Sequence, residues 1–263
     1  MFYLQDYIKK HFSTTQPYFK QMMALKGECF RHREGRMTQR IRLGNNMYFI
    51  KQYHGVGWKE IIKNIIQLRW PVLGAKNEWN AINKLQWLGI PTANVVAFAQ
   101  RGLNPAKIKS FIVMEELAPA ISVETLCQRW ITRAPSFSFK YALIKRIAKI
   151  ARLMHNNGIN HRDFYICHFL LDTSQKTEHT QEPLLYLIDL HRAQIRHKTP
   201  VRWIIKDLGS LYFSSKNVGI TKRDYYRFMR IYQDQSLREI FALRENFWKK
   251  VKSRGDHLYA NHC

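Results

Sequence analysis

The fold of this chain is decided by His161-Arg162-Asp163 and by Leu187-Ile188-Asp189-Leu190-His191, whose aspartate lies 26 residues after the first. Residues 169–171 and 184–188 are apolar and predict two short strands. Pairing of these strands as a hairpin would bring the carboxylates of Asp163 and Asp189 to one mouth of a cleft. Asp163 could then accept a proton from a hydroxyl, while Asp189 could hold the Mg²⁺ that bridges nucleotide phosphates.

Strand-like segments come before this motif, and helical segments surround and follow it. The pattern predicts strands at 29–33, 38–43, 47–53, 95–100 and 111–114, and helices at 58–70, 77–88, 138–157 and 221–233. We expect an α+β fold with two lobes. An antiparallel β-sheet lobe with an N-terminal extension occupies residues 1–117, and a mainly helical catalytic and substrate-binding lobe occupies residues 118–263. The nucleotide cleft is expected between them.

Asp163 is the candidate catalytic base, because it follows a long amphipathic helix and Gly158 and precedes an apolar strand. His161 is expected to pack and to hydrogen-bond the loop. Asp189 is the predicted metal ligand. His168 lies five residues after Asp163, where kinase loops carry a metal-binding Asn, so we include it as a candidate metal- and nucleotide-binding residue. Mg²⁺ prefers oxygen ligands, which leaves a phosphate contact by His168, or a single metal without it, as alternatives.

Lys51 and Glu78 are the candidate phosphate contact and its partner. A strand lysine held by a helix glutamate is the arrangement that kinase-type phosphoryl transfer uses. The alternative is an ordinary surface lysine and a solvated glutamate. Glu115 and Leu117 follow the strand 111–114, where backbone groups would hydrogen-bond an adenine. No G-x-G-x-x-G occurs between residues 27 and 44, so the arginines of that region are alternative phosphate contacts, and a solvated strand face is an equal alternative.

The 263 residues are 46% hydrophobic and carry a net charge of +24. The hydrophobic content supports a proper core, and the charge predicts an anionic partner: nucleic acid, a membrane surface, a phosphorylated glycolipid or an acidic carrier protein. No nucleic-acid-reading motif is present. No apolar run is long enough to span a membrane, and the N-terminus lacks a signal-peptide pattern, so we expect a cytoplasmic protein. The four cysteines are scattered, which argues against a metal or disulfide role.

The helix expected at 58–70 is basic and amphipathic, with tryptophan at both ends. Contact with a membrane surface or a partner is one interpretation. Burial of its isoleucine face against its own lobe is the favoured one.

With these residues assembled, the chain resembles the lipopolysaccharide core heptose(I) kinase family (RfaP/WaaP). The resemblance covers residues 27–232 and rests on unusual blocks at 59–64, 71–75, 78–82, 158–163, 165–171, 188–193 and 211–215. In particular, Tyr-Ile-Cys-His at 165–168 distinguishes the chain from protein kinases. The resemblance implies that His168 is a normal feature of the family at this position and not a degenerate kinase motif.

This resemblance implies a protein-kinase-like fold that transfers the γ-phosphate of ATP to O4 of the first heptose of the inner core. It implies ATP and Mg²⁺ as cofactors, with Asp163 as base, Asp189 as Mg²⁺ ligand, and Lys51 and Glu78 at the phosphates. It also implies a peripheral position at the cytoplasmic face of the inner membrane in Gram-negative bacteria, and acyl carrier protein as a partner. A kinase for the Kdo sugar or another core position, a catalytically silent scaffold, and a nucleic-acid-binding module are the alternatives.

Overall fold

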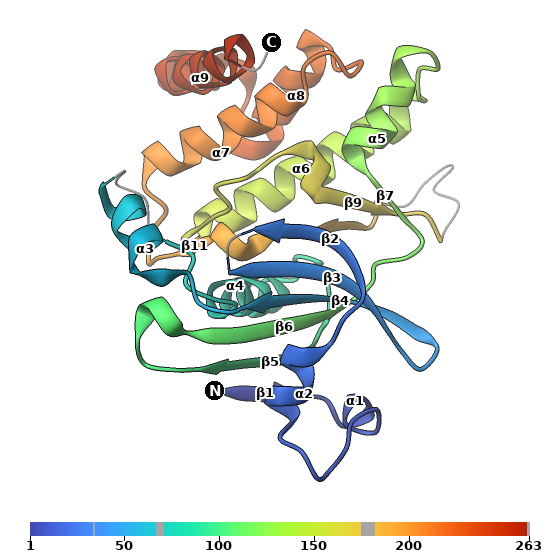
Figure 1. Ribbon diagram of the computed structural model, residues 1–263. Helices are drawn as coiled ribbons and strands as arrows, with labels where there is room; N and C mark the ends of the chain where they lie inside the picture. Colours follow the sequence, from blue (N-terminus) through green and yellow to red (C-terminus); the bar gives the residue numbers. More distant parts are fainter. Residues whose placement is uncertain (34, 67–70, 175–181, 262–263) are drawn as a thin grey trace. The chain divides into compact units, whose positions relative to one another are not determined.

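The computed structural model describes residues 1–33, 35–66, 71–174 and 182–261 (Figure 1). The chain forms two compact units. The first comprises Met1–Lys84 and Ala93–Glu116, and the second comprises Leu85–Thr92 and Leu117–Cys263. No helix of the described residues is long and apolar enough to cross a membrane.

The first unit is built on a six-stranded sheet in which all neighbours are antiparallel. Its spatial order is β1-β5-β6-β4-β3-β2. The strands are β1 (Phe2–Leu4), β2 (Glu28–Arg33), β3 (Arg36–Leu43), β4 (Asn46–Tyr53), β5 (Val95–Arg101) and β6 (Lys109–Glu115). Five of them were expected from the sequence, whereas β1 was not. Its three residues are too few to show an alternating pattern.

Two N-terminal helices, α1 (Asp6–Lys9) and α2 (Tyr18–Ala24), add the side chains that complete the core on this sheet. Ile8, Phe19 and Met22 are at most 7% exposed and belong to one cluster with Phe111 and Val113 of β6. The unit also contains η1 (Pro105–Lys107) and the helices α3 (Gly57–Ile66) and α4 (Lys76–Trp87).

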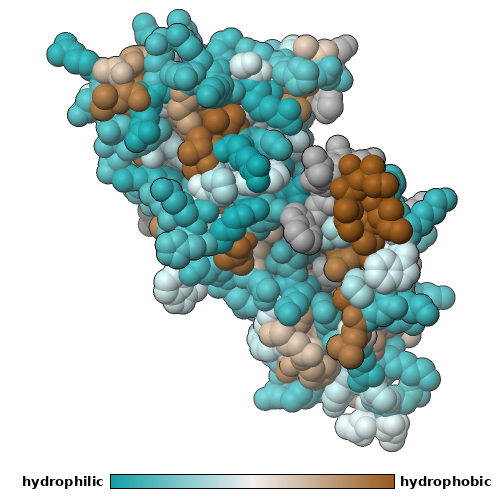
Figure 2. Space-filling view, turned by 90° about the vertical axis from the view of Figure 1, so that its left-hand side faces the viewer, coloured by the Kyte–Doolittle hydropathy of each residue, from teal (hydrophilic) through white to brown (hydrophobic). Residues whose placement is uncertain are grey.

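The favoured interpretation of the amphipathic segment, burial of its isoleucine face, is wrong for most of α3. Ile61 is buried, but Ile62, Ile65 and Ile66 are 52%, 58% and 76% exposed. Figure 2 looks onto the side of the molecule where α3 lies and shows a compact hydrophobic patch there. Residues 67–70 of the expected helix lie outside the described part of the chain.

The second unit is mainly helical. Its helices are α5 (Val123–Gln128), α6 (Phe137–Asn156), α7 (Val201–Ser214), α8 (Lys222–Gln233) and α9 (Leu237–Ala260), with short 3₁₀ turns η2 (Arg129–Ile131), η3 (Ile166–His168) and η4 (Leu190–Arg192). Side-chain caps begin several helices, and the capping box expected at the start of α8 is formed by Thr221 and Asp224. Burial raises the pKa of the Cys127 thiol to about 12, so this cysteine is inert at neutral pH.

Two small sheets of the second unit position the two aspartates, Asp163 and Asp189. Strands β7 (Ala120–Ser122), β9 (Phe169–Asp172) and β10 (Leu185–Leu187) form one, and β8 (Ile159–Asn160) pairs with β11 (Gln194–Ile195) in the other. β9 and β10 are antiparallel with Phe169 opposite Leu187, which confirms the expected hairpin. Because Asp163 precedes β9 and Asp189 follows β10, both aspartates lie at the same end of this hairpin.

Candidate active site

The loop that carries Asp163 starts from a turn that only glycine can make. Gly158 ends α6 with φ +78°, and a Cβ at this position would collide with the carbonyl oxygen of Arg196. The close approach lets β8 pair with β11, and the Arg196 N–H donates to the Gly158 carbonyl across 2.9 Å. The loop 161–165 is therefore anchored at its start by a two-stranded sheet.

Asp207 of α7 fixes the conformation of this loop by binding its main chain. Its side chain is fully buried, and it accepts hydrogen bonds from the backbone N–H groups of His161 (2.6 Å) and Arg162 (2.8 Å). Arg162 takes a left-handed conformation, φ 74°. A non-glycine residue in this region costs on the order of 1 kcal/mol, and the charge-assisted bonds offset that cost.

The two carboxylate oxygens of Asp163 differ in their contacts: one is bound by a guanidinium group, and the other is not. Nη1 of Arg192 lies 2.6 Å from Oδ1, and the Asp163 side chain is 16% exposed. Oδ2 makes no hydrogen bond to any residue that the structure describes. It can therefore accept a hydroxyl proton, as the sequence predicts for Asp163.

His168 connects the two aspartates. Its Nδ1 lies 2.6 Å from the carbonyl oxygen of Asp163, and its Nε2 lies 3.7 Å from Oδ2 of Asp189. Asp189 itself has φ 61° and its Oδ1 is 2.7 Å from Nδ1 of His191. His168 thus links the main chain at Asp163 to the carboxylate of Asp189, and the side chains of both aspartates are reached by solvent.

His161 acts as a structural side chain of this loop. It is fully buried, and its Nε2 donates to the Ile188 carbonyl across 3.0 Å. Burial first of all, opposed in part by Asp207, lowers the pKa of His161 below its ordinary value. The ring is therefore neutral at physiological pH and ties the Asp163 loop to the segment that carries Asp189.

The acidic groups of the site fit Mg²⁺ in the way that nucleotide enzymes hold it. The described residues contain no cluster of three or more His, Cys, Asp or Glu side chains that would form an all-protein cage. Mg²⁺ in phosphoryl-transfer sites needs only one or two carboxylates, because waters and substrate phosphates complete its shell. Asp189 supplies such a carboxylate, and His168 faces its Oδ2.

The ion pair predicted between Lys51 and Glu78 is present in the first unit. Lys51 extends from β4, and its Nζ lies 2.6 Å from Oε1 of Glu78 on α4. Both residues are nearly inaccessible, at 8% and 1% exposed. A buried pair of this kind holds the ammonium in one place, which a phosphate contact requires. The contact with a nucleotide stays a prediction.

The segment that was expected to bind adenine follows the end of β6. The Glu115 carboxylate accepts bonds from the Tyr7 hydroxyl and from the Asn94 amide, so this side chain has local partners. Leu117 is the first residue of the second unit after β6. Arg40, one of the alternative phosphate contacts, pairs with Glu116 instead, with Nη2 and Oε2 2.8 Å apart.

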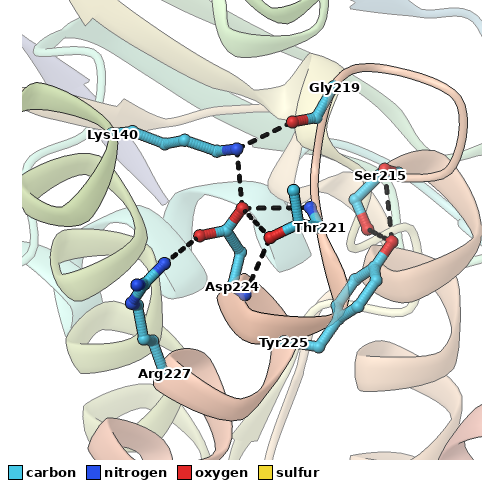
Figure 3. Close-up of polar contacts among 7 residues, drawn as sticks. All are labelled: Lys140, Ser215, Gly219, Thr221, Asp224, Tyr225 and Arg227. Atoms are coloured by element: carbon cyan, nitrogen blue, oxygen red, sulfur yellow. Dashed lines mark hydrogen bonds and ion pairs between the residues drawn. The ribbon is translucent and has the colours of Figure 1, made fainter. Parts of the chain in front are cut away.

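A largely apolar cavity of about 640 Å³ opens among the helices of the second unit. At its edge, Asp224 of α8 is held by Lys140 of α6 and by Arg227, each at 2.6 Å, and by the Thr221 cap (Figure 3). Burial alone would raise the pKa of Asp224, but the bonds from Lys140 and Thr221 hold it below its ordinary value. Its carboxylate is therefore charged and links α6 to α8.

Sequence reasoning missed two residues of this site. Arg192 lies within the block 188–193 on which the family resemblance rests, but no role was expected for it. Asp207 gave none, because its partners are backbone N–H groups 45 and 46 residues earlier in the chain.

Comparison with known proteins identifies the family. The sequence pattern of the lipopolysaccharide kinase (Kdo/WaaP) family matches residues 20–232. The chain belongs to this family. It is 46% identical over 240 residues to the lipopolysaccharide core heptose(I) kinase WaaP of Escherichia coli strain K12, covering 91% of this chain and 90% of that protein. The Pseudomonas aeruginosa protein of the same name is 43% identical over 256 residues, covering 97% and 95%.

A solved structure, described as WaaP in complex with acyl carrier protein, shares the fold of this Kdo/WaaP family member. The TM-score is 0.84 at 38% sequence identity, over 98% of this chain and 99% of that one. The α+β, protein-kinase-like fold expected from the sequence is thereby confirmed, as is the family resemblance. Membership of a kinase family also identifies ATP as the phosphate donor and the protein as a phosphotransferase acting on a sugar hydroxyl.

Proposed function

We propose that this protein transfers the γ-phosphate of ATP to O4 of the first heptose of the lipopolysaccharide inner core. The observation that carries the proposal is the arrangement of Asp163 and Asp189 around His168. It occurs in a chain whose relatives are named heptose(I) kinases. A Kdo kinase or a silent scaffold is not favoured, because those relatives share more than 40% of their residues with it over nearly the whole chain.

Asp163 orients the heptose hydroxyl and takes its proton through Oδ2, while Arg192 holds Oδ1. Asp189 would hold Mg²⁺, whose chemistry is to bridge the phosphates and neutralise the charge that develops on them. His168 is a candidate for contact with the metal or with a phosphate through Nε2. Lys51, fixed by Glu78, contacts the phosphates, and the backbone at Glu115 and Leu117 contacts the adenine.

The test is to incubate the purified protein with defined core acceptors and ATP and to locate the added phosphate by NMR. Phosphate at O4 of the first heptose is the expected result. Phosphate on a Kdo or another core sugar would support the alternative acceptor, and nucleotide binding without turnover would support the scaffold.

The first prediction concerns the base. Asp163→Ala should lower kcat at least about a hundredfold, because general-base catalysis and orientation of the hydroxyl are both lost. The melting temperature of the variant should stay near that of the wild type, because the loop is held through backbone groups by Asp207. Full transfer activity in the variant would contradict the assignment.

We also propose two partners besides the glycolipid substrate. The exposed isoleucines of α3, with Lys59 and Lys63 on the same helix, support a peripheral contact with the anionic inner face of the cytoplasmic membrane. The net charge of +24 supports binding of acyl carrier protein, a small acidic protein that accompanies WaaP in the solved structure. The apolar cavity of the second unit, about 640 Å³ in volume, is the candidate site for its acyl chain.

A further inference from the structure

Four cationic side chains surround one tryptophan of the second unit, Trp203, in the first turn of α7. The Cζ atoms of Arg162, Arg196 and Arg202 lie 5.3, 5.8 and 5.6 Å from the centroid of its ring, and the Nζ of Lys206 lies 4.3 Å from it. We call these five residues the Trp203 cluster. Its cations come from the Asp163 loop, from the residue that follows β11, and from α7, so the fold gathers them from separate segments.

Two arginines of the Trp203 cluster, Arg196 and Arg202, have no carboxylate partner among the residues that the structure describes. Arg196 donates to two neutral amides, Asn160 Oδ1 and Gln194 Oε1, each at 2.6 Å. Neither Arg196 nor Arg202 forms an ion pair with any acidic residue that the structure describes. Burial first, and then the charge of Arg202, lower the pKa of Arg196. An anion bound next to Arg196 would offset both effects by stabilising its charged form.

The local sequence accounts for this excess. Between Asp189 and Asp207 the chain contains no Asp or Glu, but it contains Arg192, Arg196, Lys198, Arg202 and Lys206. Asp207 itself is fully buried and engaged with the backbone N–H groups of the Asp163 loop. Arg202 and Lys206 are exposed, so the cluster is open to a ligand.

The cluster is joined to the proposed catalytic loop on two sides. Arg162 immediately precedes Asp163, and Arg196 binds the side chain of Asn160, three residues before that aspartate. A second bond, from the Arg196 N–H to the Gly158 carbonyl, holds the same segment. An oligosaccharide that places a hydroxyl at Asp163 therefore has its neighbouring groups next to these cations.

We propose that the Trp203 cluster binds an anionic group, a carboxylate or a phosphate, carried by the acceptor glycolipid beside the sugar that is phosphorylated. This inference rests on the proposed function. Guanidinium groups suit the site, because their planar forks donate two parallel hydrogen bonds to either kind of anion. The cluster would then select the acceptor by its charge and set its register on Asp163.

The test uses steady-state kinetics of the full chain with a defined core acceptor. The double variant Arg196→Gln/Arg202→Gln should raise the KM for the acceptor by about tenfold or more, the effect of losing charge-assisted hydrogen bonds. The KM for ATP should stay within about twofold. The kcat at saturating acceptor is compared in Arg202→Gln alone and should also stay within about twofold, because Arg196, unlike Arg202, holds Asn160 of the segment that leads to Asp163. Arg238→Gln, an exposed arginine of α9, removes the same charge elsewhere and should leave all three constants unchanged.

Modified acceptors identify the anion. In one acceptor the sugar carboxylates are reduced to alcohols, and in another the lipid phosphates are removed. The wild type and the double variant should have the same KM for the acceptor that lacks the bound group, and should still differ in KM for the other. Arg202→Lys keeps the charge and should recover part of the affinity. If the double variant has a lower melting temperature than the wild type, the comparison is made with Arg202→Gln alone, because the Arg202 side chain is exposed and lies on the ring of Trp203.

An unchanged acceptor KM in the variants, with an active wild-type enzyme, overturns this inference and leaves the proposed function standing. Absence of heptose phosphorylation by the wild type overturns the proposed function instead.

Discussion

At the scale of single residues, Arg192 gives the proposed base its direction. It holds Oδ1 of Asp163 and leaves Oδ2 for a hydroxyl. Arg162 and Asp189 both adopt left-handed backbone conformations, φ 74° and 61°, on either side of this contact. Such residues persist where surrounding bonds determine their geometry, and they concentrate at active sites. Here those bonds come from Asp207 and His191.

Arg192→Gln should lower kcat by about tenfold to a hundredfold, because a misdirected carboxylate loses its near-attack geometry. The KM for ATP should change little, and Arg192→Lys should restore part of the rate. The decisive measurement is kcat of Arg192→Gln in an Asp163→Asn background. An arginine that acts through Asp163 has little further effect there. The same fold-loss in both backgrounds would show that Arg192 acts independently of Asp163.

At the scale of elements, Asp224 links α6 to α8 through a buried ion pair. Asp224→Ala should lower the free energy of unfolding by about 3 kcal/mol, because Lys140 keeps its charge in a position that is only 14% exposed and loses its partner. Urea denaturation measures the loss. Glu239→Ala, which removes the exposed capping glutamate of α9, is the control and should cost about 1 kcal/mol or less.

The same pair gives stability a pH dependence. Because the folded-state pKa of Asp224 lies below its unfolded value of about 3.9, its contribution is fully present above that pH and is lost as pH falls through the folded pKa. The difference in unfolding free energy between wild type and Asp224→Ala should therefore be constant near neutrality and shrink below about pH 4. A difference that widens on acidification would contradict this assignment.

The exposed isoleucines of α3 are predicted to contact an anionic membrane surface. Ile65→Ser/Ile66→Ser should weaken binding to anionic phospholipid vesicles by about tenfold or more, since burying each isoleucine stabilises by roughly 1.5–3 kcal/mol. Leu103→Ser changes a fully exposed leucine of the first unit and serves as the control. Cosedimentation with vesicles measures both. Equal binding by all three proteins would exclude α3 as the contact.

These elements also show how far the sequence could be interpreted. The β9–β10 hairpin and the Lys51–Glu78 pair were predictable, because two apolar runs mark the strands and the order of the motifs along the chain marks the pair. The exposure of Ile62, Ile65 and Ile66 was not, because amphipathic periodicity marks an apolar face without saying whether the protein covers it. β1, α1 and α2 were missed because each is short and its core contacts are made with distant strands.

At the scale of the whole molecule, the charge of +24 is the dominant property. Such a surface speeds encounters with acidic partners and makes their binding sensitive to salt. The partners proposed above, a phosphorylated glycolipid and an acidic carrier protein, would account for this charge without nucleic acid, because both are anionic.

Binding of acyl carrier protein should therefore weaken strongly when salt is raised from about 50 to 500 mM, over which the screening length falls severalfold. The acylated carrier should bind more tightly than the unacylated one, because the cavity of the second unit would bury the acyl chain. Calorimetric titration of both forms measures the two effects. Equal affinities for the two forms would show that the cavity does not bind the acyl chain. Binding that does not depend on salt would show that the positive charge does not contribute to it.

Asp207 has a further consequence for how the enzyme matures. The loop before Asp163 is shaped by a carboxylate on α7, through main-chain groups rather than through the side chains at positions 161 and 162. A newly synthesised chain therefore stays inactive until residues 201–214 have been made and have docked. Formation of the catalytic loop is thereby coupled to the docking of α7, a helix that follows it by about forty residues in the chain.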